Sequence, residues 1–204
     1  MKIVLIRHGQ SEGNIIPVIQ GQMDYPLTEK GVIQAHKAGK DLKETYSIDK
    51  IYSSDLLRAT QTAEIIASYF DIAEIILTEK LRELHFGIYQ DRKSMELTKE
   101  ESAHLKSCWN NITQRYPGGE TVEELSTRVK TAFIEIINST DEDSTILIVS
   151  HRRSLFCILK EILGTVPIVT SEWFKNCSVN ELVRDNSTDK WRLIRFDNDY
   201  LDNK

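Results

Sequence analysis

The first strand of the chain and the residues directly after it constrain the fold more than any other stretch. Residues 2–6 (KIVLI) are mostly apolar and β-branched, a pattern typical of a strand that is buried on both faces in an α/β sheet. Arg7, His8 and Gly9 follow. Gly9 has no Cβ, so we expect the backbone to turn there and to leave room for a ligand. Ligands of open α/β sheets gather at the carboxyl ends of strands, where Arg7 and His8 are placed.

A second apolar run, residues 144–149, also leads into a histidine, His151. Arg58 falls in the first turn of a helix expected after another strand, from where it can lean back toward the strand end. If these strand ends lie side by side, two imidazoles and the guanidinium groups of Arg7 and Arg58 converge. An ordinary core does not tolerate such a cluster without an anion to neutralise it. The sequence therefore predicts an anion-binding site at this end of the sheet.

Strands and helices alternate along the rest of the chain. Further strands are expected at 50–53 and 75–77, and 179–183 with 191–196 indicate an antiparallel hairpin. Three helices are expected to begin after the capping residues Thr28, Asp55 and Thr121. The helix after Asp55 is expected to span 56–70, and a last helix to span 154–163. Residues 92–116 are expected to be helical in part, with Trp109 as apolar anchor. The pattern predicts an α/β fold: a three-layer α/β/α sandwich with a mostly parallel sheet and a C-terminal antiparallel hairpin, in one domain over residues 1–204.

Composition narrows the class of partner. A net charge of −5 over 204 residues argues against a general affinity for nucleic acid or for anionic membranes. No early segment has the pattern of a secretory signal, and no apolar run approaches membrane-spanning length. The three cysteines, Cys108, Cys157 and Cys177, are widely spaced and suit reduced thiols, so a cytoplasmic protein is expected.

Phosphate chemistry accounts for the predicted cluster. The planar fork of an arginine matches the oxygens of a phosphate group. A neutral imidazole is a competent nucleophile at phosphorus, and a second imidazole can donate to a non-bridging oxygen. A carboxylic acid is then needed to protonate the leaving alkoxide. Glu83, just after the strand expected at 75–77, is the best candidate.

A serine mechanism is the alternative that the same stretch suggests. Residues 9–13 (GQSEG) match the G-x-S-x-G motif of serine hydrolases, with Ser11 in the place of the nucleophile. That motif requires a mid-sheet strand and an oxyanion loop from upstream sequence. Only ten residues precede Ser11, so the structural context of the motif is missing and we set this interpretation aside.

Five ordered motifs make the chain resemble the histidine phosphatase superfamily, which includes the cofactor-dependent phosphoglycerate mutases. They span nearly the whole chain: residues 7–14 (RHGQSEGN) with Gln20-Gly21, Pro26-Leu27-Thr28 and Gly31; 53–63 (SSDLLRATQTA); 81–83 (LRE) with Phe86-Gly87; 117–120 (PGGE); and 149–151 (VSH). Together in this order they are far more specific than any single short motif.

The resemblance implies a phosphoglycerate mutase-like fold and a role for each matching residue. His8 is implied to carry a phosphoryl group during the reaction and Glu83 to donate the proton. Arg7, Arg58 and His151 are implied to hold the phosphoryl group, and Asn14, Gln20 and Gly21 to line the substrate pocket. No metal and no cofactor are implied.

Two departures from the family pattern put the substrate in doubt. The family usually has glycine after the second histidine, but this chain has Arg152, which either crowds and recharges the pocket or is a solvated charge. The family's phosphatases usually carry an aromatic residue, glutamate and glycine after Phe-Gly. This chain has Tyr89, Gln90 and Asp91 there.

The sequence favours the first of three functions and leaves the other two as alternatives. The first is a phosphomonoester hydrolase that acts on a small phosphorylated metabolite. The second is a mutase, although mutases of this family tend to be longer, and residues 87–117 form only a short segment here. The third is a phosphoanion-binding module without catalysis, which would need the arginines but neither His8 nor Glu83. The physiological substrate and the oligomeric state are not predicted.

Overall fold

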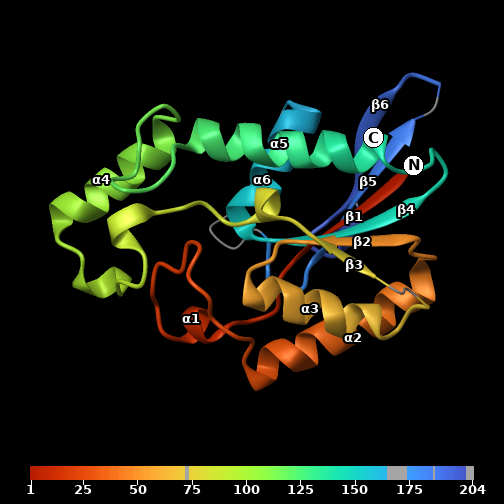
Figure 1. Cartoon of the computed structure of the whole chain (residues 1–204), viewed down its shortest axis with the longest axis horizontal. Coiled ribbons are helices and arrows are strands. Elements are labelled where there is room, and N and C mark those ends of the chain that lie inside the picture. The colour runs from red at the N-terminus through yellow and green to blue at the C-terminus, as the bar shows by residue number, and fades with distance from the viewer. Residues whose placement is uncertain (72–73, 165–173, 186, 201–204) are drawn as a thin grey trace.

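The centre of the molecule is a twisted sheet whose strands follow the order β3-β2-β4-β1-β5-β6-β7, seen in the computed structural model in Figure 1. The structure describes residues 1–71, 74–164, 174–185 and 187–200. Strands β3, β2, β4 and β1 run parallel, whereas β5, β6 and β7 pair antiparallel. The strands are β1 Lys2–Arg7, β2 Lys50–Ser53, β3 Ile75–Leu77, β4 Thr145–Ser150, β5 Val179–Asp185, β6 Lys190–Phe196 and β7 Asp199–Tyr200.

Helices cover both faces of this sheet, which confirms the predicted three-layer sandwich (Figure 1). Helices α2 (Glu29–Thr45) and α3 (Leu57–Ala67) pack on one face, and α5 (Val122–Asn138) and α6 (Arg152–Leu163) on the other. Two further helices, the short α1 (Glu12–Ile15) and α4 (Lys99–Asn110), lie toward one end of the molecule. The chain also has 3₁₀ turns at Glu79–Leu81, Gly87–Tyr89 and Ser94–Glu96. None of the described helices is long and apolar enough to cross a membrane.

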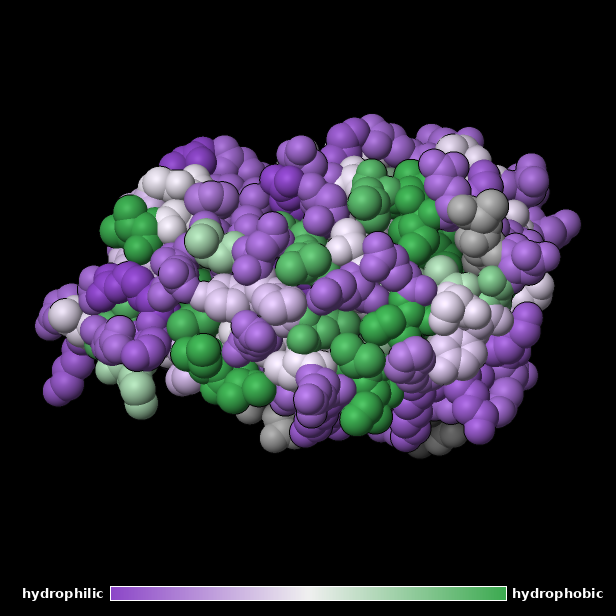
Figure 2. All heavy atoms as spheres, turned by 60° about the horizontal axis from the view of Figure 1, so that its bottom comes forward, coloured by the Kyte–Doolittle hydropathy of each residue, from purple (hydrophilic) through white to green (hydrophobic). Residues whose placement is uncertain are grey.

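The two apolar runs are buried because each strand divides its side chains between two cores. Ile3 and Leu5 of β1 join the cluster beneath α5 and α6, while Val4 and Ile6 join the cluster beneath α2 and α3. Alternate side chains of a strand point to opposite faces, so a central strand with helices on both sides must be apolar throughout. The outer surface is mixed: Figure 2 shows polar residues with apolar patches between them.

The predicted helix caps are confirmed at two of three starts. The Thr28 and Thr121 hydroxyl groups accept the N–H groups of Gly31 and Glu124, respectively. The third prediction was wrong, because α3 begins at Leu57 and ends at Ala67 and its capping residue is not Asp55. The Asp55 carboxylate is bound by the Arg82 guanidinium (Nε to Oδ1, 2.8 Å). The distant Asp24 accepts the N–H of Leu57 instead (2.9 Å).

The observed start of helix α6 differs from the predicted one and places two arginines within the helix. Helix α6 begins at Arg152, two residues before the predicted start, so Arg152 and Arg153 occupy its first turn. It ends as predicted at Leu163, and its C-terminal capping residue is Gly164, whose φ of 71° favours glycine. Within 92–116 the helical part is α4, and Trp109 packs against the main core. The hairpin is confirmed as β5 and β6.

Candidate active site

The register of the central strands brings the two histidines together. Strands β1 and β4 are parallel neighbours in which Arg7 lies opposite Ser150. The next residues, His8 and His151, therefore leave the sheet side by side, with ring centroids 5.2 Å apart. Strand β2 lies on the other side of β4, and its extension at Ser54 donates its N–H to the Val149 carbonyl (3.0 Å). Helix α3 starts just beyond it and carries Arg58, so the predicted convergence of these residues is observed.

A backbone carbonyl fixes the tautomer of His8. Its Nδ1 lies 2.7 Å from the Gly9 carbonyl oxygen, which can only accept a hydrogen bond. Nδ1 therefore carries the proton, and Nε2 of the neutral ring keeps a free lone pair. Burial and the charges of Arg58 and Arg7 hold the pKa of His8 well below its usual 6.5, although the bond to Gly9 opposes this. The ring is uncharged at neutral pH.

The two arginines are buried, and each is anchored by backbone carbonyls. Arg7 donates from Nη1 to the Phe174 carbonyl (2.9 Å). Arg58 donates to the carbonyls of Met23 (2.8 Å) and Gly21 (2.7 Å). Burial lowers the pKa of Arg7 to about 9 and that of Arg58 to about 10. Both remain cationic at neutral pH, but neither has a carboxylate bound to its guanidinium among the described ion pairs.

Glu83 lies in the same cavity, with its carboxylate held by two backbone groups. Oε1 accepts the N–H of Leu84 (2.8 Å), and Oε2 accepts the N–H of Arg153 at the start of α6 (3.3 Å). The backbone on either side of Glu83 is fixed by Arg128 of α5, which donates to the carbonyls of Arg82 (2.9 Å) and Glu83 (3.3 Å). The carboxylate therefore has a defined position, and Glu83 is only 8% exposed to solvent.

Asn14, Gln20 and Gly21 line the cavity as the family resemblance implied. The N–H of Ser11 donates to Asn14 Oδ1 (3.0 Å), which leaves the Asn14 amino group free of protein partners in the described structure. The Ser11 hydroxyl lies 2.8 Å from Gln20 Oε1 and is fully buried. Ser11 thus organises the loop and does not face the cavity, which weighs against the serine mechanism.

The expectation for Gly9 was wrong in one respect. A Cβ on Gly9 would lie 2.7 Å from the Gly31 carbonyl oxygen, and a Cβ on Gly31 would lie 2.0 Å from the Gln10 carbonyl oxygen. The missing side chains allow the loop after β1 to pack against the start of α2, and the space is not left to a ligand. Gly21, by contrast, has a φ of 51°, in the left-handed region that glycine adopts more readily than other residues.

His151 supports the cluster from behind the cavity wall. It is fully buried, its Nε2 lies 2.9 Å from the Ser54 hydroxyl, and burial and Arg58 hold its pKa well below 6.5. Its Nδ1 has no hydrogen-bond partner. Within the described residues, five buried polar side-chain atoms lack a partner, and four belong to this site: Arg7 Nε, Arg58 Nε, His151 Nδ1 and Arg152 Nε. Unpaired buried polar atoms of this kind are costly unless a ligand completes their bonds, and the arginine N–H groups among them can only donate.

The cavity is larger than the predicted residues account for. Its volume is about 610 Å³, a size usual for sites that enclose a whole small molecule. Part of the wall comes from residues 86–117 and from the start of α6, and the sequence did not predict it: Phe86, Ser94, Leu97, Ser102, Leu105, Lys106, Trp109, Tyr116 and Arg153. No local motif marks them, because they become neighbours only when α4 folds over the strand ends.

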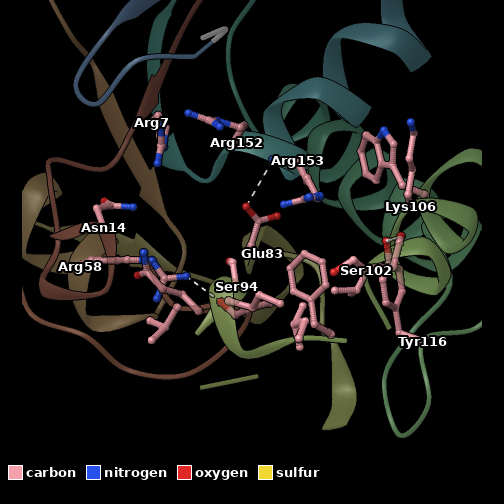
Figure 3. Close-up of a pocket in the computed structure, with 18 of the residues that line it drawn as sticks. Arg7, Asn14, Arg58, Glu83, Ser94, Ser102, Lys106, Tyr116, Arg152 and Arg153 are labelled. Carbon is pink, nitrogen blue, oxygen red and sulfur yellow. Dashed lines mark hydrogen bonds between the residues drawn. The ribbon is translucent and has the colours of Figure 1, made fainter. Parts of the chain in front are cut away.

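Arg152 also lines the cavity. In Figure 3 it lies beside Arg7, on the side where Asn14 and Arg58 are found, with Glu83 nearer the middle. Burial and the adjacent Arg153 lower the pKa of Arg152. The charged side chain that replaces the family's usual glycine therefore lines the cavity, as the first of the two interpretations expected, and its contact with substrate stays a prediction.

The arrangement combines an uncharged imidazole with a free lone pair, buried guanidinium groups and one carboxylate in a single cavity. These are the groups needed to bind a tetrahedral anion and to move a proton at its edge. The part of the chain that the structure describes has no group of three or more His, Cys, Asp or Glu side chains placed to hold a metal ion.

Known proteins resemble this chain over nearly its whole length. A protein of Photorhabdus laumondii named "Probable phosphoglycerate mutase GpmB" is 39% identical over 184 residues, which cover 89% of this chain and 84% of the relative. Bacillus stearothermophilus YhfR superposes with a TM-score of 0.84 at 27% identity, covering 98% of each chain. A mycobacterial glucosyl-3-phosphoglycerate phosphatase superposes with a TM-score of 0.81 at 25% identity, covering 96% of this chain and 98% of its own. The model of the histidine phosphatase superfamily (branch 1) matches residues 3–199, and the chain belongs to this family.

Proposed function

We propose that the protein is a phosphomonoester hydrolase that works through a phosphohistidine at His8. In the first step His8 Nε2 attacks phosphorus, the ester P–O bond breaks, and Glu83 in its acid form gives its proton to the leaving alkoxide. In the second step the Glu83 carboxylate takes a proton from water, whose oxygen attacks phosphorus. The P–N bond then breaks, and inorganic phosphate leaves.

The main support for this proposal is the tautomer of His8. The carbonyl of Gly9 keeps the proton on Nδ1, so Nε2 is available for attack without a separate base. Arg7 and Arg58 line the same cavity and match the charge that spreads over the phosphoryl oxygens in the transition state. The amino groups of Asn14 and Gln20 add neutral donors on the same side.

Water is the proposed acceptor of the phosphoryl group, in preference to a second hydroxyl of the substrate. The solved structures that resemble the chain include a phosphatase of glucosyl-3-phosphoglycerate. Curated relatives carry the name of a phosphoglycerate mutase, so transfer back to a hydroxyl is the second candidate. The short segment between Gly87 and Pro117, with α4 as its only long helix in the described structure, favours the hydrolase.

The experiment is phosphate release from a broad panel of monoesters, measured for the parent protein and for His8→Ala. The proposal expects release that disappears in His8→Ala and persists in Ser11→Ala and in His36→Ala, a surface histidine bonded to Tyr69. It also expects release to persist in the presence of a metal chelator. Release that survives in His8→Ala would overturn the phosphohistidine mechanism.

The mutase is tested in the same samples. Interconversion of 2-phosphoglycerate and 3-phosphoglycerate that outpaces phosphate release would favour the second candidate. Binding of phosphate without any turnover would leave only the anion-binding module.

A further inference from the structure

The cavity carries more positive charge than one phosphate group can neutralise. Among its described lining residues, five side chains are cationic (Arg7, Arg58, Lys106, Arg152 and Arg153) and only Glu83 is acidic. The lining residues alone thus carry a net charge of about +4, and a phosphomonoester dianion would offset about two of these charges. Packing like charges in a partly dry cavity is unfavourable, so the remaining cations suggest a second anionic group.

Arg153 is the cation whose geometry most clearly indicates a ligand. Its guanidinium stacks between two aromatic rings, 4.7 Å from the Phe86 centroid and 5.1 Å from the Trp109 centroid. Stacking fixes the plane of the fork while leaving its edge available for bonds. It has no carboxylate partner among the described residues, whereas Arg82, Arg92, Arg115, Arg128 and Arg184 each have one.

The position of Arg153 on its helix strengthens this argument. Arg152 and Arg153 occupy the first turn of the twelve-residue helix α6. The N-terminal end of a helix carries partial positive charge, which disfavours cations there and favours anions. The Glu83 carboxylate, which accepts the N–H of Arg153, supplies one negative charge at this end. Two adjacent arginines therefore leave a net positive charge there, which a ligand anion can offset.

Figure 3 separates the cavity into two ends. Arg7, Asn14, Arg58 and Arg152 lie at one end, and Arg153, Ser102, Lys106 and Tyr116 lie toward the other, with Glu83 between them. The first is the proposed phosphoryl end. At the second end Lys106 of α4 has no ion-pair partner among the described residues, and the Ser102 hydroxyl, one turn earlier on the same helix, lines the cavity.

We propose that this second end, with Arg153 as its main contact and Lys106 at its rim, binds a second anionic group of the substrate. The inference rests on the proposed function and deepens it: the preferred substrates are phosphomonoesters that carry a carboxylate or a further phosphate away from the scissile ester. The cavity is also lined by apolar and aromatic side chains, among them Leu97, Leu105 and Trp109, which suit an apolar stretch of the same molecule.

The test compares phenyl phosphate with 4-carboxyphenyl phosphate and with benzene-1,4-diyl bisphosphate. The ratio of kcat/KM for each doubly anionic ester to that for phenyl phosphate is measured in the parent, Arg153→Gln, Arg153→Lys and Lys106→Gln. Lys99→Gln is the matched control, because Lys99 begins the same helix and does not line the cavity. Differences in leaving group between the esters are the same in every variant, so the change in the ratio reports the anion site.

We expect at least one ratio to be well above one in the parent and to fall roughly tenfold in Arg153→Gln. Arg153→Lys should keep part of the preference, Lys106→Gln should lose less than Arg153→Gln, and Lys99→Gln should match the parent. The ester with the higher parent ratio shows whether the second group is a carboxylate or a phosphate. A parent ratio near one for both esters, or ratios unchanged in Arg153→Gln, would overturn the inference.

Failure of the proposed function would be seen separately, as no phosphate release from any of the three esters. The anion site is then still tested by calorimetric binding of phenylphosphonate and 4-carboxyphenylphosphonate. Tighter binding of the carboxylated compound that is lost in Arg153→Gln would support the site without turnover. Equal binding of the two compounds would show that the second end does not bind a carboxylate. The matched bisphosphonate would test in the same way whether that end binds a phosphate.

Discussion

The imidazole rings of His8 and His151 lie 5.2 Å apart and are tilted by 54° to one another, although they come from opposite ends of the chain. Both rings are buried beside Arg58. A second positive charge on either ring would face this guanidinium in a place with little water. The pair is therefore stable only while both rings are neutral, and this neutrality is what the proposed attack by His8 requires.

The first prediction concerns the protonation of these rings. We expect histidine NMR at pH 6 to show His8 as a neutral ring with its proton on Nδ1, because burial and two arginines lower its pKa well below 6.5. The unfolded chain takes up protons at these positions below about pH 6.5, whereas the folded protein does not. The free energy of unfolding should therefore fall as the pH decreases below 6.5. A His8 signal that titrates at or above pH 6.5 would contradict this.

The second prediction concerns Arg58. Replacing it by alanine should cost on the order of 3 kcal/mol in kcat/KM, roughly a hundredfold, through lost stabilisation of the phosphoryl charge. Arg58→Lys should recover only part of the activity, because a single ammonium cannot reproduce the fork that also binds the carbonyls of Gly21 and Met23. Urea unfolding of both variants separates this loss from instability. Full activity in the lysine variant would show that the fork is unnecessary.

The third prediction concerns Arg152 at the phosphoryl end. Arg152→Gly restores the residue usual in the family and removes a cation that lies beside Arg7. We expect inorganic phosphate to inhibit this variant roughly 5- to 10-fold less tightly than the parent. Arg152→Gln is the control for the flexibility of glycine and should behave alike. Unchanged inhibition constants in both variants would mean that Arg152 does not contact the phosphate.

The fourth prediction concerns Arg128, which we interpret as a residue that positions Glu83. Its guanidinium binds the Glu120 carboxylate (2.7 Å) and the backbone carbonyls of Lys80, Arg82 and Glu83. If Glu83 protonates the leaving group, Arg128→Lys should slow hydrolysis of alkyl phosphates about tenfold, and p-nitrophenyl phosphate much less. The nitrophenolate leaves without needing a proton. Glu83→Gln should show the same selectivity more strongly in kcat/KM, which reports the first step, while kcat falls on both substrates because the second step lacks its base. Equal losses on both substrates in Arg128→Lys would indicate a purely structural role.

Much of the fold was predictable because local patterns and tertiary structure agree. The runs in β1 and β4 are apolar at successive positions because helices cover both faces of the sheet, and their adjacency places His8 beside His151. The Thr121 cap is likewise a local device that needs only the helix itself. The Asp55 cap failed because a non-local partner, Arg82, takes its carboxylate.

The distal part of the cavity was not predictable for a related reason. Phe86, Trp109 and Arg153 are far apart in sequence, and nothing in the local pattern of any one of them indicates a stack. Arg153 in particular lies just before the helix start expected at Ser154, so the sequence did not place it in the first turn of α6. Residues that act through non-local packing are found only when the packing is known.

The most direct test of the account is rapid-quench labelling with a phosphomonoester that carries a radioactive phosphoryl group. The account predicts label on the protein during turnover that is lost in acid, survives in base and maps to the peptide that contains His8, as a phosphoramidate should. The label should be absent in His8→Ala and should accumulate in Glu83→Gln when a nitrophenyl ester is used, because the second step then lacks its base. Acid-stable label on Ser11, or turnover with no labelled protein at any quench time, would contradict it.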